Sequence, residues 1–137
     1  MINIVCGPKG TGKTKIILAE MDKALEVAKG DIVFITDKKN ESIRVINFNV
    51  RVLYTEDFGV KCEKCFGGFV KGLMAGNADI EYVFIDGLTR IIGDNFKDIT
   101  AFLDVIKWLE KEYGIKATIT VSKLKEEFPD EYKAFIE

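Results

Sequence analysis

Short apolar runs alternate along the chain with longer segments in which apolar residues return every three or four positions. The runs, each long enough for one buried strand, lie at residues 2–6, 32–36, 50–55, 80–85 and 117–121. Strands that alternate with helices in this way form a mostly parallel sheet with helices on both faces. We therefore predict an α/β fold of three layers around a mostly parallel five-stranded sheet.

Three segments place their apolar residues on one helix face and predict helices over residues 12–29, 62–75 and 99–113. Gly114 follows the third segment, and a glycine in this place commonly ends a helix because it adopts the left-handed conformation without strain. Pro129 predicts a further helix near the C-terminus, since proline is favoured in a first helical turn.

One stretch does not follow this alternation. Residues 37–49 are mostly polar, which predicts a loop, while Ile43, Val45 and Ile46 fit either a short helix or an irregular strand. No internal repeat or boundary interrupts the rest of the pattern. We therefore expect residues 1–137 to form a single domain.

The composition is that of a globular domain. Of the 137 residues, 47% are hydrophobic and 31% are charged, which is enough apolar material for one core. The net charge of −2 gives no clear signal for nucleic acid or anionic lipid. No run approaches the roughly 18 uncharged apolar residues of a membrane span, and residues 1–6 lack the basic flank of a signal peptide. We expect a cytoplasmic protein without a membrane span.

The chain has three cysteines and no histidine, which excludes several kinds of site. It offers no Ser-His-Asp triad, no Cys-His pair and no imidazole ligand for zinc. Cys62 and Cys65 form a C-x-x-C, but a zinc site needs two further ligands, and Cys6 is the one cysteine left. Both lie on the apolar stripe of the predicted 62–75 helix, which favours buried packing over a redox or metal role.

The strongest chemical signal is a glycine-rich segment between the first predicted strand and the first predicted helix. It matches the phosphate-loop pattern G-x-x-x-x-G-K-[ST]. Its residues are Gly7, Pro8, Lys9, Gly10, Thr11, Gly12, Lys13 and Thr14. The glycines let backbone N–H groups converge on phosphate oxygens, and the helix N-terminus adds partial positive charge. We predict that this segment binds a nucleotide, with Lys13 at the β- and γ-phosphates and Thr14 as a ligand of Mg²⁺.

A phosphate loop needs a carboxylate that holds the magnesium through water. Residues 82–86 are four apolar residues followed by an acid, which places Asp86 at the carboxyl end of a predicted central strand. Ligands of open α/β sheets bind at that edge. We therefore predict Asp86 as a second metal ligand and, with Lys13, as part of the catalytic machinery.

These two segments resemble the Walker A and Walker B elements of P-loop NTPases, and the resemblance covers nearly the whole chain. It points to the recombinase-like branch, in which a further strand separates the two motif strands. Ser122 stands where that branch usually carries a polar residue that senses the γ-phosphate. The chain is also similar to short clostridial-type ATP-binding proteins, which are often named after the twitching-motility ATPase. The resemblance implies a P-loop NTPase fold that binds ATP or ADP with Mg²⁺.

The chain departs from these relatives directly after Asp86. Many of them carry a glutamate there that polarises the attacking water, and this chain has Gly87. Recombinase-like enzymes place the glutamate near the end of the second strand, where Asp37 and Glu41 are the nearest acids. We predict Asp37 as the catalytic base, with a solvated or capping acid as the alternative. Arg90 either contacts phosphate, in this chain or in a neighbouring subunit, or is a surface charge or ion pair.

The sequence favours a Mg²⁺-dependent ATP-binding protein that is a slow ATPase or a nucleotide-driven switch, because Gly87 disfavours fast turnover. A small-molecule or nucleotide kinase is the alternative. Kinases of this size usually need a basic lid, for which residues 38–39 and 123–125 are the only basic clusters that the sequence offers. Adenine is favoured because the guanine-reading N-K-x-D motif is absent. A sheet with so little decoration is expected to act through a homo-oligomer or a protein partner.

Overall fold

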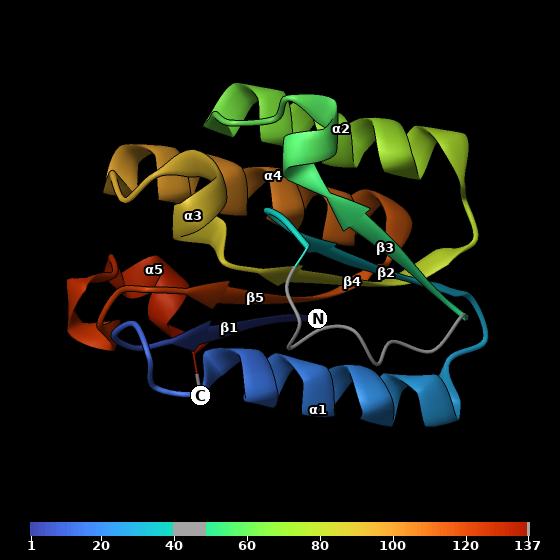
Figure 1. Ribbon diagram of the computed structural model, residues 1–137, viewed down its shortest axis with the longest axis horizontal. Coiled ribbons are helices and arrows are strands. Elements are labelled where there is room, and N and C mark those ends of the chain that lie inside the picture. Colours follow the sequence, from blue (N-terminus) through green and yellow to red (C-terminus); the bar gives the residue numbers. More distant parts are fainter. Residues whose placement is uncertain (40–48, 137) are drawn as a thin grey trace.

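The computed structural model describes residues 1–39 and 49–136 and shows an α/β fold in three layers (Figure 1). Five strands form one sheet in which each neighbouring pair is parallel. They are β1 (Ile2–Cys6), β2 (Asp31–Thr36), β3 (Val50–Tyr54), β4 (Ile80–Asp86) and β5 (Lys116–Val121). The hydrophobic pattern predicts these five strands correctly, to within one residue at each end.

The strand order across the sheet is β1-β5-β4-β2-β3. Strand β5 therefore lies between β1, which leads into the glycine-rich segment, and β4, which ends in Asp86. A strand between these two is what the sequence resemblance predicts. Because all the strands run the same way, their carboxyl ends meet at one edge of the sheet, and residues that follow β1, β2, β4 and β5 are brought together there.

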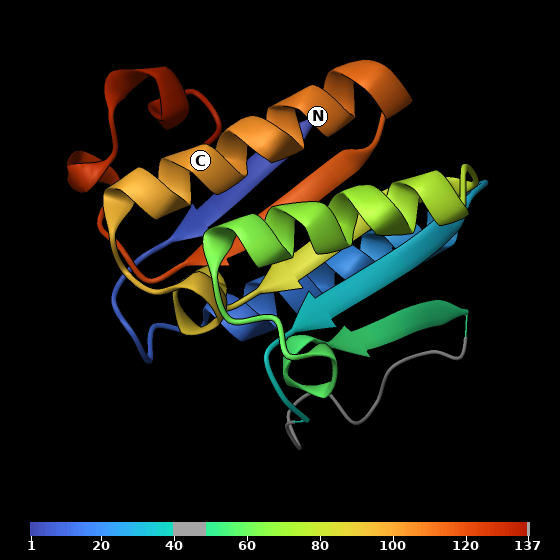
Figure 2. The ribbon, with the colours of Figure 1, turned by 90° about the horizontal axis from the view of Figure 1, so that it is seen from above.

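Helices cover both faces of the sheet. They are α1 (Lys13–Val27), α2 (Glu63–Gly76), α3 (Leu88–Ile92), α4 (Phe96–Tyr113) and α5 (Asp130–Lys133), with 3₁₀ turns η2 (Thr55–Phe58) and η3 (Lys125–Glu127). Helix α1 lies on one face, and α2, α3 and α4 lie on the other (Figure 1). Seen from above, α2 and α4 lie side by side over the sheet and run roughly along the direction of the strands (Figure 2). Within the described residues, no helix combines the length and the apolar character that crossing a bilayer requires.

Buried aromatic and aliphatic side chains hold these layers together. Phe66 of α2 stacks on Phe102 of α4 with ring centroids 4.5 Å apart, and both rings are fully buried. Burial of one such side chain contributes about 1.5–3 kcal/mol. On the opposite face, α1 buries Ile17 and Met21 against Phe84. The helical spacing of these apolar positions is therefore what directs each helix onto its face of the sheet.

Some predicted elements differ in detail. Helix α3 is missing from the prediction because five residues are too few to show helical periodicity. The C-terminal helix exists but spans four residues, and Pro129 is its N-cap instead of a first-turn residue. The predictions for Glu41, Ile43, Val45 and Ile46 concern positions outside the described residues.

The prediction that Cys62 and Cys65 are buried is wrong, because both side chains are exposed. Cys62 precedes α2 as its N-cap residue, with an extended backbone. The buried stripe of the helix runs through Phe66, Val70 and Met74. Cys65 is one position before the start of this stripe, which rotates it about 100° away from the core. The apolar pattern is compatible with two phases of the helix, and the structure has the one that buries Phe66 completely.

Candidate functional site

The glycine-rich segment forms the loop between β1 and α1, at the carboxyl edge of the sheet. Gly12 is the N-cap residue of α1, with φ 85° and ψ 21°, and it offers no side chain to cap the helix. A positive φ of this size strains any residue except glycine. The N–H groups of the first turn of α1 are therefore left available to an anionic ligand, which the positive end of the helix dipole also attracts.

The Lys13 side chain turns back over this loop. Its ammonium donates hydrogen bonds to the carbonyl oxygens of Gly7 (3.0 Å) and Pro8 (2.7 Å), and the Thr11 hydroxyl also donates to Pro8 (2.7 Å). Burial lowers the pKa of Lys13 below its ordinary value, while the carboxylate of Asp86 partly opposes that shift. The loop thus holds a partly desolvated cation whose present partners are neutral carbonyls.

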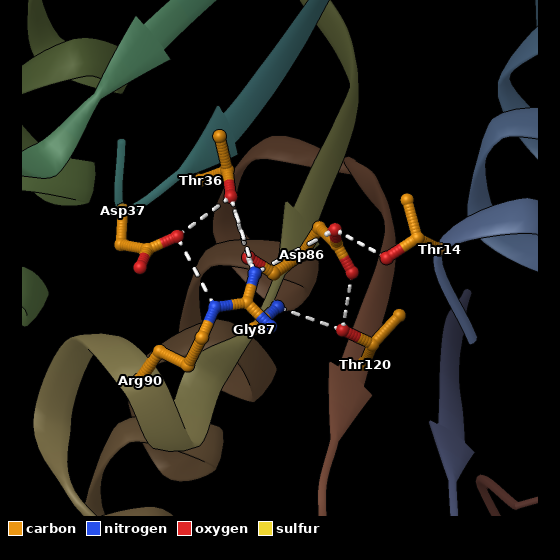
Figure 3. Close-up of polar contacts among 7 residues, drawn as sticks. All are labelled: Thr14, Thr36, Asp37, Asp86, Gly87, Arg90 and Thr120. Atoms are coloured by element: carbon orange, nitrogen blue, oxygen red, sulfur yellow. Dashed lines mark hydrogen bonds and ion pairs between the residues drawn. The ribbon is translucent and has the colours of Figure 1, made fainter. Parts of the chain in front are cut away.

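Asp86 ends β4 with a buried side chain that accepts hydrogen bonds from two threonines (Figure 3). The Thr14 hydroxyl donates to one carboxylate oxygen at 2.9 Å, and the Thr120 hydroxyl donates to the other at 2.7 Å. The Gly87 N–H donates to the Thr120 oxygen at 2.7 Å. Strand β5 therefore orients the carboxylate of β4 so that its second oxygen meets the first turn of α1.

Arg90, from α3, joins Asp86 to the end of β2 (Figure 3). Its Nε lies 3.2 Å from a carboxylate oxygen of Asp37. Its Nη2 lies 3.3 Å from the backbone carbonyl oxygen of Asp86 and 3.8 Å from a carboxylate oxygen of the same residue. The Thr36 hydroxyl lies 3.0 Å from the same carbonyl oxygen. Arg90 thus forms the ion pair that was one of its two predicted roles, while its side chain stays 41% exposed.

A cleft of about 770 Å³ opens between the loop and these charged groups. Its lining residues are Lys9, Gly10, Gly12, Lys13, Thr14, Lys15, Leu18, Asp86, Arg90, Thr120 and Ser122. Four of these side chains are basic and one is acidic, so the cleft suits an anionic ligand.

The predicted site residues take different places around this cleft. Those that line it are Lys9, Gly10, Gly12, Lys13, Thr14, Asp86 and Ser122. Gly7, Pro8 and Thr11 do not line it, and they take part in the hydrogen bonds that hold the loop together. Asp37 is not part of the lining and connects to the cleft through Arg90.

The oxygen ligands at this site fit magnesium better than zinc. Thr14 and Asp86 bring a hydroxyl and a carboxylate together, and Mg²⁺ is commonly held by one or two such oxygens together with water and substrate phosphates. The described part of the chain contains no cluster of three or more His, Cys, Asp or Glu side chains that could hold a metal alone. A metal at this site would therefore depend on oxygens that the ligand supplies.

Sequence reasoning missed Thr36 and Thr120, although both contribute hydroxyl groups to the site. Each is a buried polar residue near the end of an otherwise apolar strand. A buried hydroxyl needs a partner, so a threonine at the carboxyl end of a central strand is a signal that could have indicated this role. What the sequence does not reveal is the partner, because Thr120 and Asp86 are 34 positions apart.

Neither of two comparisons with known proteins identifies a relative of this chain. No protein-family model matches the chain, and a search of curated proteins gives no match. The fold and the geometry of the cleft therefore carry the functional argument.

Proposed function

We propose that this protein binds a nucleoside triphosphate, preferably ATP, as its magnesium complex and acts as a slow ATPase or a nucleotide-driven switch. The observation that carries the proposal is the 2.9 Å contact between the Thr14 hydroxyl and the Asp86 carboxylate. It joins residues 72 positions apart at the mouth of a basic cleft. A hydroxyl at a helix N-terminus beside a strand-end carboxylate is the arrangement that Mg²⁺ and a phosphate chain require.

Lys13 is the residue that we expect to recognise the phosphate chain. Its ammonium bonds to the carbonyl oxygens of Gly7 and Pro8, and anionic phosphate oxygens are stronger acceptors for a charged donor. Lys13 would therefore exchange these loop contacts for phosphate contacts. Because Lys13 is partly shielded from water, the new bonds would be stronger than on a fully open surface.

Thr14 and Asp86 would hold the magnesium ion, and they fit it because their oxygens already lie in contact. The ion would neutralise part of the charge on the phosphates. The Thr120 hydroxyl would keep its bond to the other Asp86 oxygen and so fix the orientation of the carboxylate.

Slow turnover follows from the position of the acids. Among the described residues that line the cleft, Asp86 is the one carboxylate, and binding the metal would occupy it. Asp37, the proposed base, is paired with Arg90. Phosphate oxygens in the cleft would compete with Asp37 for the guanidinium, and Asp37 becomes free to orient a water molecule only when Arg90 moves. A base that has to be released in this way is easily misplaced by an ångström, which slows the reaction.

Thermal unfolding with and without Mg·ATP tests the binding site. A ligand at about 100 times its Kd adds roughly 2.7 kcal/mol of stability. For a domain of this size, the melting temperature should rise by roughly 6–12 °C. Lys13→Ala should abolish this rise and leave the melting temperature without ligand nearly unchanged. Lys23→Ala, at an exposed position of the same helix, should keep the rise. A rise that persists in Lys13→Ala would overturn the phosphate-loop assignment.

Steady-state phosphate release tests the slow reaction. The wild-type protein should turn over well below the roughly 10 s⁻¹ that is typical of enzymes. Both Asp37→Ala and Asp86→Ala should lower that rate further. Fast wild-type hydrolysis that is unchanged in Asp37→Ala would show that the base lies elsewhere. Consumption of ATP that requires an added acceptor alcohol would favour a kinase.

A further inference from the structure

Two exposed cysteines lie at the start of α2, apart from the phosphate cleft. Cys62 is the N-cap residue of this 14-residue helix, and its sulfur accepts a hydrogen bond from the Cys65 backbone N–H at 3.4 Å. Both side chains are exposed, whereas the third cysteine, Cys6, is half-buried at the end of β1. The function proposed for the cleft uses neither Cys62 nor Cys65.

The arrangement of Cys62 and Cys65 is compatible with a disulfide. Side chains three positions apart on a helix surface have Cβ atoms about 5–6 Å apart, and a disulfide brings them to roughly 3.5–4.5 Å. Cys62 lies outside the regular helix, with φ −137° and ψ 164°, and already directs its sulfur back over the first turn. A disulfide would therefore require the Cys65 side chain to rotate toward Cys62 and the N-cap to shift so that the two Cβ atoms approach each other.

The same contacts make the two thiols chemically different. A hydrogen bond from the Cys65 side chain and another from its backbone N–H lower the pKa of Cys62. The neighbouring Cys62 raises the pKa of Cys65. Burial raises the pKa of Cys6. A thiolate is the attacking species in disulfide exchange, so Cys62 is suited to attack first and Cys65 to attack second.

We propose that Cys62 and Cys65 form a reversible dithiol–disulfide pair that exchanges with a low-molecular-weight disulfide. The Cys62 thiolate attacks one sulfur of that disulfide, forms a mixed disulfide and releases the other half as a thiolate, which takes up a proton. Cys65 then loses its proton and attacks the Cys62 sulfur. The Cys62–Cys65 bond forms, and the second half leaves as a thiol. Two protein thiols are oxidised, and one small disulfide is reduced to two thiols.

Equilibration of the full chain with mixtures of reduced and oxidised glutathione tests this proposal. Samples are quenched with acid, unfolded, alkylated with N-ethylmaleimide and measured by intact and peptide mass spectrometry. We expect a species in which Cys6 alone is alkylated and Cys62 is linked to Cys65, and dithiothreitol should reverse it. Brief alkylation of the reduced protein at neutral pH should label Cys62 several-fold faster than Cys65 or Cys6.

Serine variants test the order of the steps. Cys65→Ser should trap glutathione on Cys62, because no second thiol can release it. Cys62→Ser keeps an N-cap residue that helices favour, so it should fold while collecting far less glutathione. Cys6→Ser should leave the disulfide unaffected.

Several results would overturn the proposal. They are separate glutathione adducts on Cys62 and Cys65, oxidation of Cys6 before the pair, and a zinc-bridged dimer that uses the pair from two copies.

Discussion

The sheet carries polar networks of different kinds at the two ends of its strands. At the edge where the strands begin, one Glu81 carboxylate oxygen accepts hydrogen bonds from the backbone N–H groups of Lys29 and Gly30, each at 2.8 Å. The other Glu81 oxygen lies 3.1 Å from the Lys116 ammonium. Each of these groups has a partner of complementary charge or polarity, and the network ties the end of α1 to β4 and β5.

At the edge where the strands end, the charged groups have partners that a ligand could replace. Lys13 bonds to neutral carbonyl oxygens of its own loop. Arg90 is shared among the Asp37 carboxylate, the Asp86 carboxylate and the Asp86 carbonyl oxygen while its side chain is 41% exposed. An incoming phosphate would exchange for these partners without breaking the fold. The difference suggests a general distinction. Closed pairs such as Glu81 with Lys116 stabilise the fold, whereas a lysine that bonds to carbonyl oxygens and an arginine that is shared among several acceptors are suited to binding a ligand.

The strongest test of this distinction is Asp86→Asn. Asparagine keeps an oxygen for the Thr120 hydroxyl, so the fold should be retained, but the negative charge is lost. Loss of an outer-shell group, such as a carboxylate that holds the ion through water, typically lowers metal affinity by about 10–100-fold. We expect a loss of this size in the Mg²⁺ concentration dependence of ATP binding, measured by titration calorimetry. Asp31→Asn makes the same change at the opposite edge and should leave that dependence unaltered.

A second test addresses Gly87, the position where many of the P-loop NTPases that the sequence resembles carry glutamate. Gly87 has φ +92°, and a Cβ atom there would overlap the Arg90 guanidinium. Gly87→Ala should therefore destabilise the fold by about 1–2 kcal/mol, from the left-handed backbone alone. Gly87→Glu should likewise lose stability instead of gaining turnover. Urea denaturation measures the change.

Gly72→Ala is the matched control for this glycine. Gly72 lies inside α2, and a Cβ atom there meets no other atom within 4 Å. The same substitution should therefore stabilise the protein by about 0.5–1 kcal/mol. A Gly87→Ala protein as stable as Gly72→Ala would mean that the turn after β4 can adopt another conformation.

The parts of this molecule that the sequence predicts well depend on neighbouring residues. The strands, the glycine-rich loop and the strand-end Asp86 are each determined within about ten positions, by apolar runs and by the backbone that glycine allows. The contacts of Asp86 with Thr120 and of Arg90 with Asp37 depend on which strand lies beside which. Periodicity identifies a strand but does not reveal its neighbour, so these partners emerge only from the strand order.

The cysteines show a second limit of sequence reasoning. The spacing of Cys62 and Cys65 fits the apolar stripe of α2, yet both side chains are exposed. An amphipathic pattern gives the period of a helix. It does not define well the residue at which the helix begins, or which side chains at its end face the core, when those side chains are small. Here Phe66 is the first residue large enough to anchor the helix in the core.

The smallest expected effect belongs to the edge where the strands begin. The N–H groups of Gly30 and Lys29, followed by Lys116, lower the pKa of Glu81 below its ordinary value of 4.5. Because the pKa of Glu81 is lower in the folded protein than in the unfolded chain, the ionised carboxylate stabilises the fold. This stabilisation is fully present above pH 4.5 and is lost as the pH falls through the folded-state pKa. Glu81→Gln should cost about 1 kcal/mol or less at neutral pH, since the side chain is partly exposed. Urea unfolding from about pH 7 to about pH 3 should show this difference shrinking as the pH falls below 4.5, where Glu81 is protonated first in the unfolded chain. The melting shift with Mg·ATP should be the same in both proteins, and a weaker shift in Glu81→Gln would show that the two edges are coupled.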